Sequence, residues 1–218
     1  MGRISLANAM KRNSSYYGKA QYRFCWYFIN GVKQLRPVLV IGAEHFLSVE
    51  NRRVFANHTS HFDYPIICSS TRDRFVVPFK IKHYDWFPIF FDFGGGLWID
   101  PDNVDRPYAV QMARVLRSLP SDVTFMLFPE GERNKGDATE IGEINPAMHM
   151  YTTGGDYLVI VYVAGARGWL NPFTPSPVVY IREPIPMSQV PGKAEFGEWL
   201  QAEMQQGLNF AHQVFINR

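Results

Sequence analysis

Two histidines and an aspartate lie close together in the stretch FANHTSHFDYP, which runs from Phe55 to Pro65. His58 and Asp63 are five residues apart, a spacing that would turn them about 140° away from each other on a single helix. If instead a strand ends near His58 and a helix begins near Asp63, the loop between them can fold both side chains inward. The carboxylate would then accept a hydrogen bond from one imidazole nitrogen and leave the other nitrogen as a base. Such a base could take a proton from a substrate hydroxyl as that oxygen attacks an electrophile.

The same stretch allows two other interpretations. His58, His61 and Asp63 could ligate a divalent metal ion, as in a metal-dependent hydrolase. A closed metal site needs a fourth ligand with recognisable spacing, and the remaining histidines are scattered singly along the chain, at His45, His83, His149 and His212. We therefore expect no metal site. The stretch could also be a polar turn with incidental histidines, and the residues by themselves leave that alternative open.

Short apolar runs indicate the elements that must position this stretch. We expect strands at residues 37–42, 52–57, 74–81, 96–100, 123–131, 157–165 and 177–185. Several of these runs are continuously apolar, which is typical of strands buried on both faces. We expect helices at roughly residues 64–70, 104–118, 145–153 and 193–214. The alternation predicts an α/β fold with a mixed, largely parallel central sheet flanked by helices.

In such a sheet, functional groups collect on the loops that follow the carboxyl ends of the strands. One such loop holds residues 57–63, and another holds a second polar stretch, FPEGERN, from Phe128 to Asn134. Together, NHTSHFD and FPEGERN resemble the signatures Asn-His-x-x-x-x-Asp and Phe-Pro-Glu-Gly-Thr-Arg of the glycerolipid acyltransferase family, which includes 1-acylglycerol-3-phosphate acyltransferases. The motifs occur in the family's order, about seventy residues apart, and the resemblance covers roughly Phe55 to Ala164.

The resemblance implies an O-acyltransferase in which His58 deprotonates an acceptor hydroxyl and Asp63 orients the imidazole. The acyl donor would be a fatty acyl thioester on coenzyme A or on acyl carrier protein, used as a co-substrate, with no bound cofactor or metal. The acceptor would be a lysophospholipid such as 1-acylglycerol-3-phosphate. His61 occupies a variable position of the motif and is expected to be incidental. A non-catalytic lipid-binding protein with the same fold is a further alternative.

The residues implied to bind substrate lie in the second motif and in an intermediate segment. Gly131 would let the backbone approach a ligand closely. Arg133 would offer a planar fork to a phosphate or another anion. Glu130 would either hydrogen-bond sugar or glycerol hydroxyls or hold Arg133 in place. Lys82 fits a lysine that the family has between its two motifs.

Three positions depart from the family pattern. Glu132 replaces the threonine of the second motif, and Pro101 stands where the intermediate segment has a phosphate-binding arginine. Both changes weaken a site for a dianionic phosphate, because a lost charge-assisted hydrogen bond costs about 1.5–3 kcal/mol. The acceptor could therefore be a less charged lysolipid or an amine. Tyr162 replaces a proline in the family's later Val-Pro-Val strand.

The first 36 residues combine basic side chains with a dense aromatic cluster. This mixture suits the headgroup region of a membrane, although a first helix that packs its aromatics on the core is an equal alternative. We predict a helical membrane-interface segment at residues 1–36 and an α/β acyltransferase domain at residues 37–218. No apolar run is long enough to span a bilayer, so the protein is expected to bind the cytoplasmic face of a membrane peripherally. The net charge of +2 gives no reason to expect nucleic-acid binding.

Overall fold

The structure of the protein is a computed structural model that describes residues 27, 30–31, 34, 36–71, 73, 75–80, 96–99, 106–119, 123–136 and 138–218. Most of the predicted N-terminal segment therefore lies outside the described residues, and so do Lys82 and Pro101. The family-like stretches from Phe55 to Pro65 and from Phe128 to Asn134 are both fully described.

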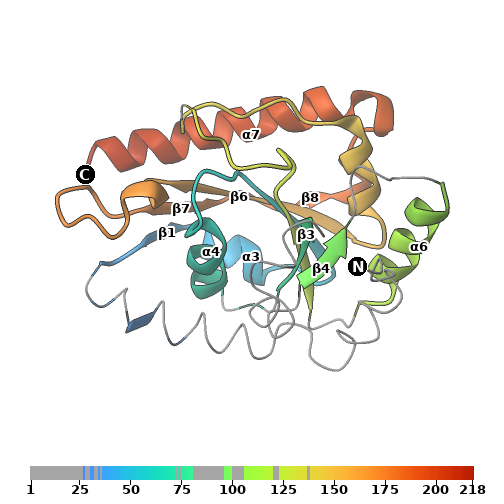
Figure 1. Ribbon diagram of the computed structural model, residues 1–218, viewed down its shortest axis with the longest axis horizontal. Coiled ribbons are helices and arrows are strands. Elements are labelled where there is room, and N and C mark those ends of the chain that lie inside the picture. Colours follow the sequence, from blue (N-terminus) through green and yellow to red (C-terminus); the bar gives the residue numbers. More distant parts are fainter. Residues whose placement is uncertain are drawn as a thin grey trace, which may run out of the picture.

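A central sheet of eight strands organises the described residues (Figure 1). Its strands are β1 (Leu39–Ile41), β2 (Arg52–Ala56), β3 (Phe75–Lys80), β4 (Gly96–Ile99), β5 (Thr124–Leu127), β6 (Tyr157–Ala164), β7 (Val178–Ile181) and β8 (Ile185–Pro186). Their spatial order is β1-β7-β6-β2-β5-β3-β4, and β8 also pairs with β6. β2 is parallel to both β5 and β6, whereas β7 and β8 are antiparallel to β6. The expected mixed, largely parallel sheet is confirmed.

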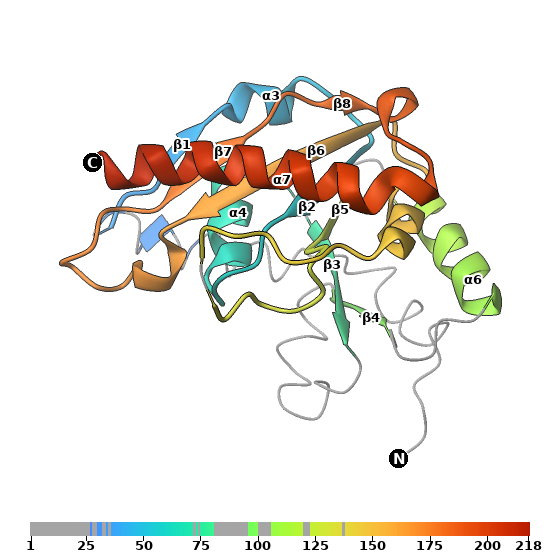
Figure 2. The ribbon, with the colours of Figure 1, turned by 90° about the horizontal axis from the view of Figure 1, so that it is seen from above.

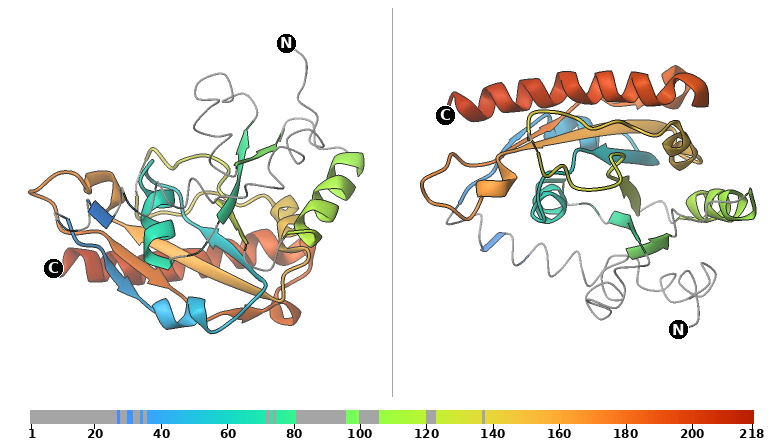
Figure 3. Two further views of the ribbon diagram at one scale, coloured as in Figure 1. Left: turned by 90° about the horizontal axis from the view of Figure 1, so that it is seen from below. Right: turned by 45° about the horizontal axis from the view of Figure 1, so that its top comes forward.

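Helices cover both faces of this sheet (Figures 1 and 3). One face packs against α6 (Arg106–Arg117), the 3₁₀ helix η3 (Pro146–Thr152) and α7 (Lys193–Ile216), and the other against α3 (Ala43–Leu47) and α4 (Asp63–Thr71). The remaining described helices are the short 3₁₀ turns η4 (Ala166–Gly168) and η5 (Met187–Gln189).

The strand β2 shows why the apolar runs are continuous. Phe55 packs into the cluster under α7, whereas its neighbours Val54 and Ala56 pack into the cluster under α4. All three side chains are fully buried. Because successive side chains of a strand point to opposite faces, the part of a strand that is covered on both sides is apolar at successive positions, as it is here from Val54 to Ala56.

Two expected elements differ in form from the structure. The helix expected at residues 145–153 is the 3₁₀ helix η3, which Asn145 caps by accepting a hydrogen bond from the Ala147 amide at 2.8 Å. The strand expected at residues 177–185 is divided into β7 and β8, which pair with different parts of β6. Pro184 lies in the break, where a proline suits the chain because it has no amide hydrogen to donate to a ladder.

The C-terminal helix α7 runs along one face of the sheet (Figure 2). Its Gly207 faces the ring of Tyr162 so closely that a Cβ atom there would lie 2.1 Å from a ring carbon. The Tyr162 hydroxyl donates to the Glu203 carbonyl at 3.1 Å, so the buried phenol is satisfied. Tyr162, which stands where the family has a proline, therefore fits under α7 because the helix has a glycine opposite its ring. Of the described helices, none is both long and apolar enough to cross a membrane.

Candidate active site

The loop that carries the two histidines begins directly after the central strand β2. Asn57 is fully buried at its start. Its side-chain amide donates to the Val163 carbonyl at 3.0 Å and accepts from the Val163 amide at 2.7 Å. These two bonds extend the β2–β6 pairing by one residue with side-chain atoms. The backbone that leads into His58 is therefore fixed to the neighbouring strand.

His58 and Asp63 do meet across the loop. His58 Nδ1 lies 3.1 Å from Asp63 Oδ2. The same carboxylate oxygen accepts from the amides of Thr59 at 2.6 Å and Ser60 at 2.7 Å. Asp63 is the first residue of α4 and is fully buried, whereas the His58 side chain is 22% exposed. The arrangement fixes the carboxylate and points one imidazole nitrogen at it, which leaves Nε2 as the nitrogen that could accept a proton.

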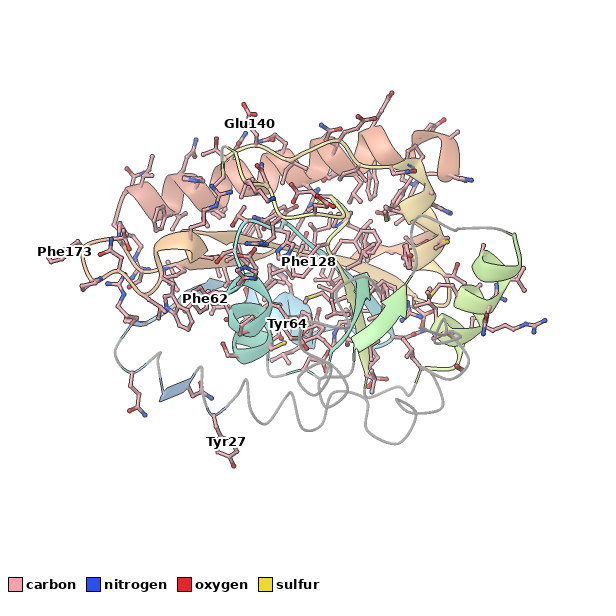
Figure 4. The ribbon with its side chains drawn as sticks, in the orientation of Figure 1. Tyr27, Phe62, Tyr64, Phe128, Glu140 and Phe173 are labelled. Atoms are coloured by element: carbon pink, nitrogen blue, oxygen red, sulfur yellow. The ribbon has the colours of Figure 1, made fainter. Side chains whose placement is uncertain are left out.

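The second motif holds the other side of His58. A turn from Phe128 to Gly131 closes with a 3.0 Å bond between the Gly131 amide and the Phe128 carbonyl, and Gly131 has a φ of 72°, in the left-handed region that favours glycine. The Phe128 ring stacks on the His58 imidazole with 4.1 Å between centroids. The Asn134 amide donates to the His58 carbonyl at 2.7 Å. Figure 4 shows Phe128, Phe62 and Tyr64 around the start of α4.

The carboxylate of Glu130 contacts backbone in the structure. Its Oε1 accepts from the His58 amide at 2.9 Å, and its Oε2 accepts from the Gly142 amide at 3.3 Å. Burial raises the pKa of this carboxyl, while the two amide hydrogen bonds act in the opposite direction. We therefore interpret Glu130 as a residue that positions His58, and its predicted contact with substrate hydroxyls stays a prediction.

An open pocket of about 390 Å³ is lined in part by residues 59–62, the loop between His58 and Asp63, although neither of these two residues lines it. Its walls come from the loop after β2, the segment after the second motif and the turn after β6, and its lining residues are Thr59, Ser60, His61, Phe62, Arg133, Asn134, Lys135 and Arg167. Three of these side chains are cationic. The His61 side chain is exposed overall, but partial desolvation, followed by the nearby charge of Arg133, lowers its pKa and favours its neutral form. The pocket is therefore suited to an anionic group.

The predicted acceptor residues fall at different places in this arrangement. Arg133 lines the pocket, and its guanidinium makes no hydrogen bond or ion pair with the part of the chain that the structure describes, so it can bind a ligand. Gly131 shapes the turn beside it. His61 lies in the pocket wall and is exposed. Lys82 lies outside the described residues, and its place in the site stays a prediction.

A metal centre has no support in the geometry of the described residues. They contain no group of three or more His, Cys, Asp or Glu side chains arranged to hold an ion. Asp63 directs its Oδ2 toward two amides and the His58 ring.

Arg167 is a pocket residue that the sequence did not reveal. It follows β6 in the turn η4, and its guanidinium donates to backbone carbonyls of two other loops. Carbonyl groups are present at every residue, so no residue pattern marks such a contact in a sequence. Asn57 belongs to the first motif, but only the structure shows its pairing with Val163.

Comparison with known proteins identifies the family and the fold of the chain. The sequence model of the family described as Acyltransferase matches residues 37–160, a range that contains both motif loops. The structure is similar to the crystal structure of the 1-acyl-sn-glycerophosphate (LPA) acyltransferase PlsC from Thermotoga maritima, with a TM-score of 0.60 over 93% of this chain and 79% of that one. The two sequences are 16% identical, so this likeness establishes the fold. No curated protein sequence matches the chain. Because the family's sequence model covers more than half of its length, the chain belongs to the acyltransferase family.

Proposed function

We propose that this protein transfers a fatty acyl group from an acyl thioester to a hydroxyl of a lysophospholipid such as 1-acylglycerol-3-phosphate. The observation that carries the proposal is the 3.1 Å contact between His58 Nδ1 and a buried carboxylate, in a loop whose intervening residues line an open cationic pocket. Membership of the acyltransferase family supports the reaction class. The acceptor named for the similar Thermotoga protein supports the choice of a lysophospholipid.

His58 is proposed to act as the general base. Its Nε2 takes the proton of the acceptor hydroxyl while the oxygen attacks the thioester carbonyl. The resulting tetrahedral intermediate collapses to an ester, and the C–S bond breaks. The departing thiolate then recovers the proton from the imidazolium. Asp63 contributes by holding the imidazole in one tautomer and by stabilising the transient positive charge.

The pocket is proposed to bind the anionic part of the acceptor. Arg133 offers a guanidinium that no described residue engages, and Lys135 adds a second cation to the same wall. This charge supports a phosphate-bearing headgroup. Glu132 and Pro101 still favour the alternative of a less charged lysolipid or an amine, because Glu132 adds a negative charge in place of a threonine and Pro101 stands where the family has an arginine. The experiment must therefore compare acceptors.

A panel of acceptors tests the proposal directly. The purified protein is incubated with a labelled acyl-coenzyme A, or with the same acyl group on acyl carrier protein, and with lysophosphatidic acid, lysophosphatidylglycerol, lysophosphatidylcholine or monoacylglycerol. We expect a diacylated product, identified by mass, with the highest kcat/KM for a phosphate-bearing acceptor. A higher value for monoacylglycerol would establish the alternative acceptor class. The absence of a diacylated product with every acceptor and both donors would contradict the proposal.

We further propose peripheral binding to the cytoplasmic face of a membrane, where a single-tailed acceptor resides and thioester donors are available. A loop at residues 169–175, close to pocket residue Arg167, supports this proposal. Phe173 is 93% exposed at its tip and Leu170 is 56% exposed, and Figure 4 shows Phe173 directed away from the protein. The loop is ordered nonetheless, because Arg36 donates to the carbonyls of Trp169, Pro172, Thr174 and Pro175.

Replacing Leu170 and Phe173 with serine should reduce binding to vesicles. Fully burying one such side chain contributes about 1.5–3 kcal/mol. We therefore expect the partition coefficient for phosphatidylethanolamine–phosphatidylglycerol vesicles, measured by flotation, to fall by about tenfold or more. Leu47 is 74% exposed on α3 and provides a matched control, since Leu47→Ser removes an equally exposed side chain from another surface. Equal flotation of the double variant and the unaltered protein would remove this loop from the proposal.

A further inference from the structure

Arg167 connects two loops that come from distant parts of the chain. Its Nε donates to the Thr59 carbonyl at 2.9 Å, in the loop that carries His58 and Asp63. Its two terminal nitrogens donate to the carbonyls of Gly136, at 2.8 Å, and Asn134, in the segment after the second motif. One guanidinium therefore contacts both sides of the pocket.

The sheet order explains why an arginine occupies this position. The adjacent strands β6, β2 and β5 are parallel, so the loops that follow them meet at one edge of the sheet. The strands β6 and β5 lie on opposite sides of β2 and do not pair with each other. A side chain from the loop after β6 must be long to reach the loop after β5. It also needs several donors in a fixed plane to bind three carbonyls, and a guanidinium meets both requirements.

The contacts of Arg167 also lead toward the reacting groups. The Thr59 residue whose carbonyl it binds donates its own amide to Asp63 Oδ2 at 2.6 Å. Arg167 also binds carbonyls of residues 134–136. This segment directly follows Arg133 and includes Lys135, and both of these cations line the pocket wall. Its removal would therefore affect the pocket wall more than Asp63, because Asp63 keeps the Ser60 amide and the His58 ring as partners.

We propose that Arg167 is a positioning residue that holds the two walls of the substrate pocket at a fixed separation and so sets the affinity for the anionic substrate. Its role as a link between loops rests on the structure alone. Its effect on affinity rests on the proposed acyl transfer. The competing explanation is that Arg167 acts only as a cation that attracts the substrate anion.

Substitution by lysine separates these explanations. Arg167→Lys keeps the positive charge but places its donors on a single nitrogen, which cannot bind carbonyls of both loops in the same way. If Arg167 acts as a link between the loops, Arg167→Lys should therefore lose that link almost as completely as Arg167→Gln does. If Arg167 acts only as a cation, its effect on substrate affinity should be kept in the lysine variant and lost in the glutamine variant.

Arg53 provides a matched control at the opposite end of β2. Its guanidinium also donates to carbonyls of two separate segments, at Leu116 (2.9 Å) and Thr153 (3.0 Å). Arg53→Lys removes the same kind of contact from a site far along the strand from the pocket. It controls for a general loss of stability, which is monitored by thermal unfolding of every variant.

Hydrogen exchange followed by mass spectrometry tests the link without any substrate. We expect both Arg167 variants to speed amide exchange in peptides that cover residues 59–63 and 133–136, and Arg53→Lys to leave these peptides unchanged. Unchanged exchange in both Arg167 variants would overturn the proposal. The same exchange pattern in Arg53→Lys would overturn it too, since the effect would then reflect stability alone.

Kinetics with acyl-coenzyme A and lysophosphatidic acid test the consequence for affinity. We expect both Arg167 variants to raise the KM for lysophosphatidic acid about tenfold with kcat within about threefold of the unaltered protein. A KM close to the unaltered value in Arg167→Lys would show that charge alone matters and would overturn the proposal. If the unaltered protein transfers no acyl group at all, the proposed function fails, and the exchange experiment still decides whether Arg167 links the loops.

Discussion

Replacing His58 with alanine should lower the rate of acyl transfer by about 10²- to 10⁴-fold, the usual contribution of a positioned general base. The imidazole is directed by Asp63 through Nδ1 and held by the stacked Phe128 ring, so its Nε2 has a defined position. Without it, the remaining side-chain contact to Asp63 from the described residues of the loop is that of the Thr59 hydroxyl, at 3.5 Å, and a hydroxyl is not a base near neutral pH. The rate is measured with acyl-coenzyme A and the best acceptor of the panel.

The second histidine of the motif gives the comparison for this result. His61→Ala removes an exposed imidazole from the pocket wall, which we expect to lower kcat less than tenfold. Thermal unfolding should show that both variants remain folded, because His58 is partly exposed and His61 is exposed. Activity of His58→Ala above about one tenth of the unaltered value would contradict the base assignment. The alternative of a non-catalytic lipid-binding protein would instead require that the unaltered protein also transfers no acyl group.

Replacing Asp63 with asparagine should have the next largest effect, a loss of about 10²- to 10³-fold in kcat. Asparagine has nearly the same shape and can keep an oxygen near the amides of Thr59 and Ser60, but it has no charge to stabilise a protonated imidazole. The loss should fall on kcat with little change in KM, because Asp63 is fully buried and does not line the pocket. Steady-state kinetics of the purified variant check the prediction.

Asparagine and alanine at this position should differ in stability. Asp63→Ala leaves the buried amides of Thr59 and Ser60 without their acceptor, and an unsatisfied buried group costs about 1–3 kcal/mol. We therefore expect a clearly lower Tm for alanine and a nearly normal Tm for asparagine, with a loss of about 10²-fold or more in kcat for both variants. An asparagine variant with normal activity would show that the carboxylate serves only to fold the loop.

The fold was largely predictable because its strands are buried on both faces. The run YLVIVYVA in β6 and the last three residues of RRVFA in β2 are apolar at successive positions, so short apolar segments between turns identify them. The five-residue helix α3 was not expected, since so short an element has little periodicity to recognise. The break between β7 and β8 depends on how each pairs with β6, which is a property of the partner strand.

The candidate site was predictable only where side chains meet side chains. The spacing of His58 and Asp63 led to their contact because a short loop is enough to bring them together. Glu130 and Arg167 could not be interpreted in the same way. Both bind backbone amides or carbonyls that lie 72 and 108 residues away in the chain, and such partners have no residue type that a sequence pattern could show.

The pairing of β2 has a consequence for the order in which the protein is built by the ribosome. β2 is synthesised early, but its two neighbours, β5 and β6, follow much later. His58 cannot receive its hydrogen bond from Asn134 before residue 134 exists, and Asn57 cannot pair before Val163 does. Arg167 follows both Asn134 and Val163 in the chain, so it can link the two pocket walls only after those residues have been made. The loop proposed to perform the reaction therefore lacks its full set of neighbours until residue 167 has been made, and those contacts join distant segments, which form slowly.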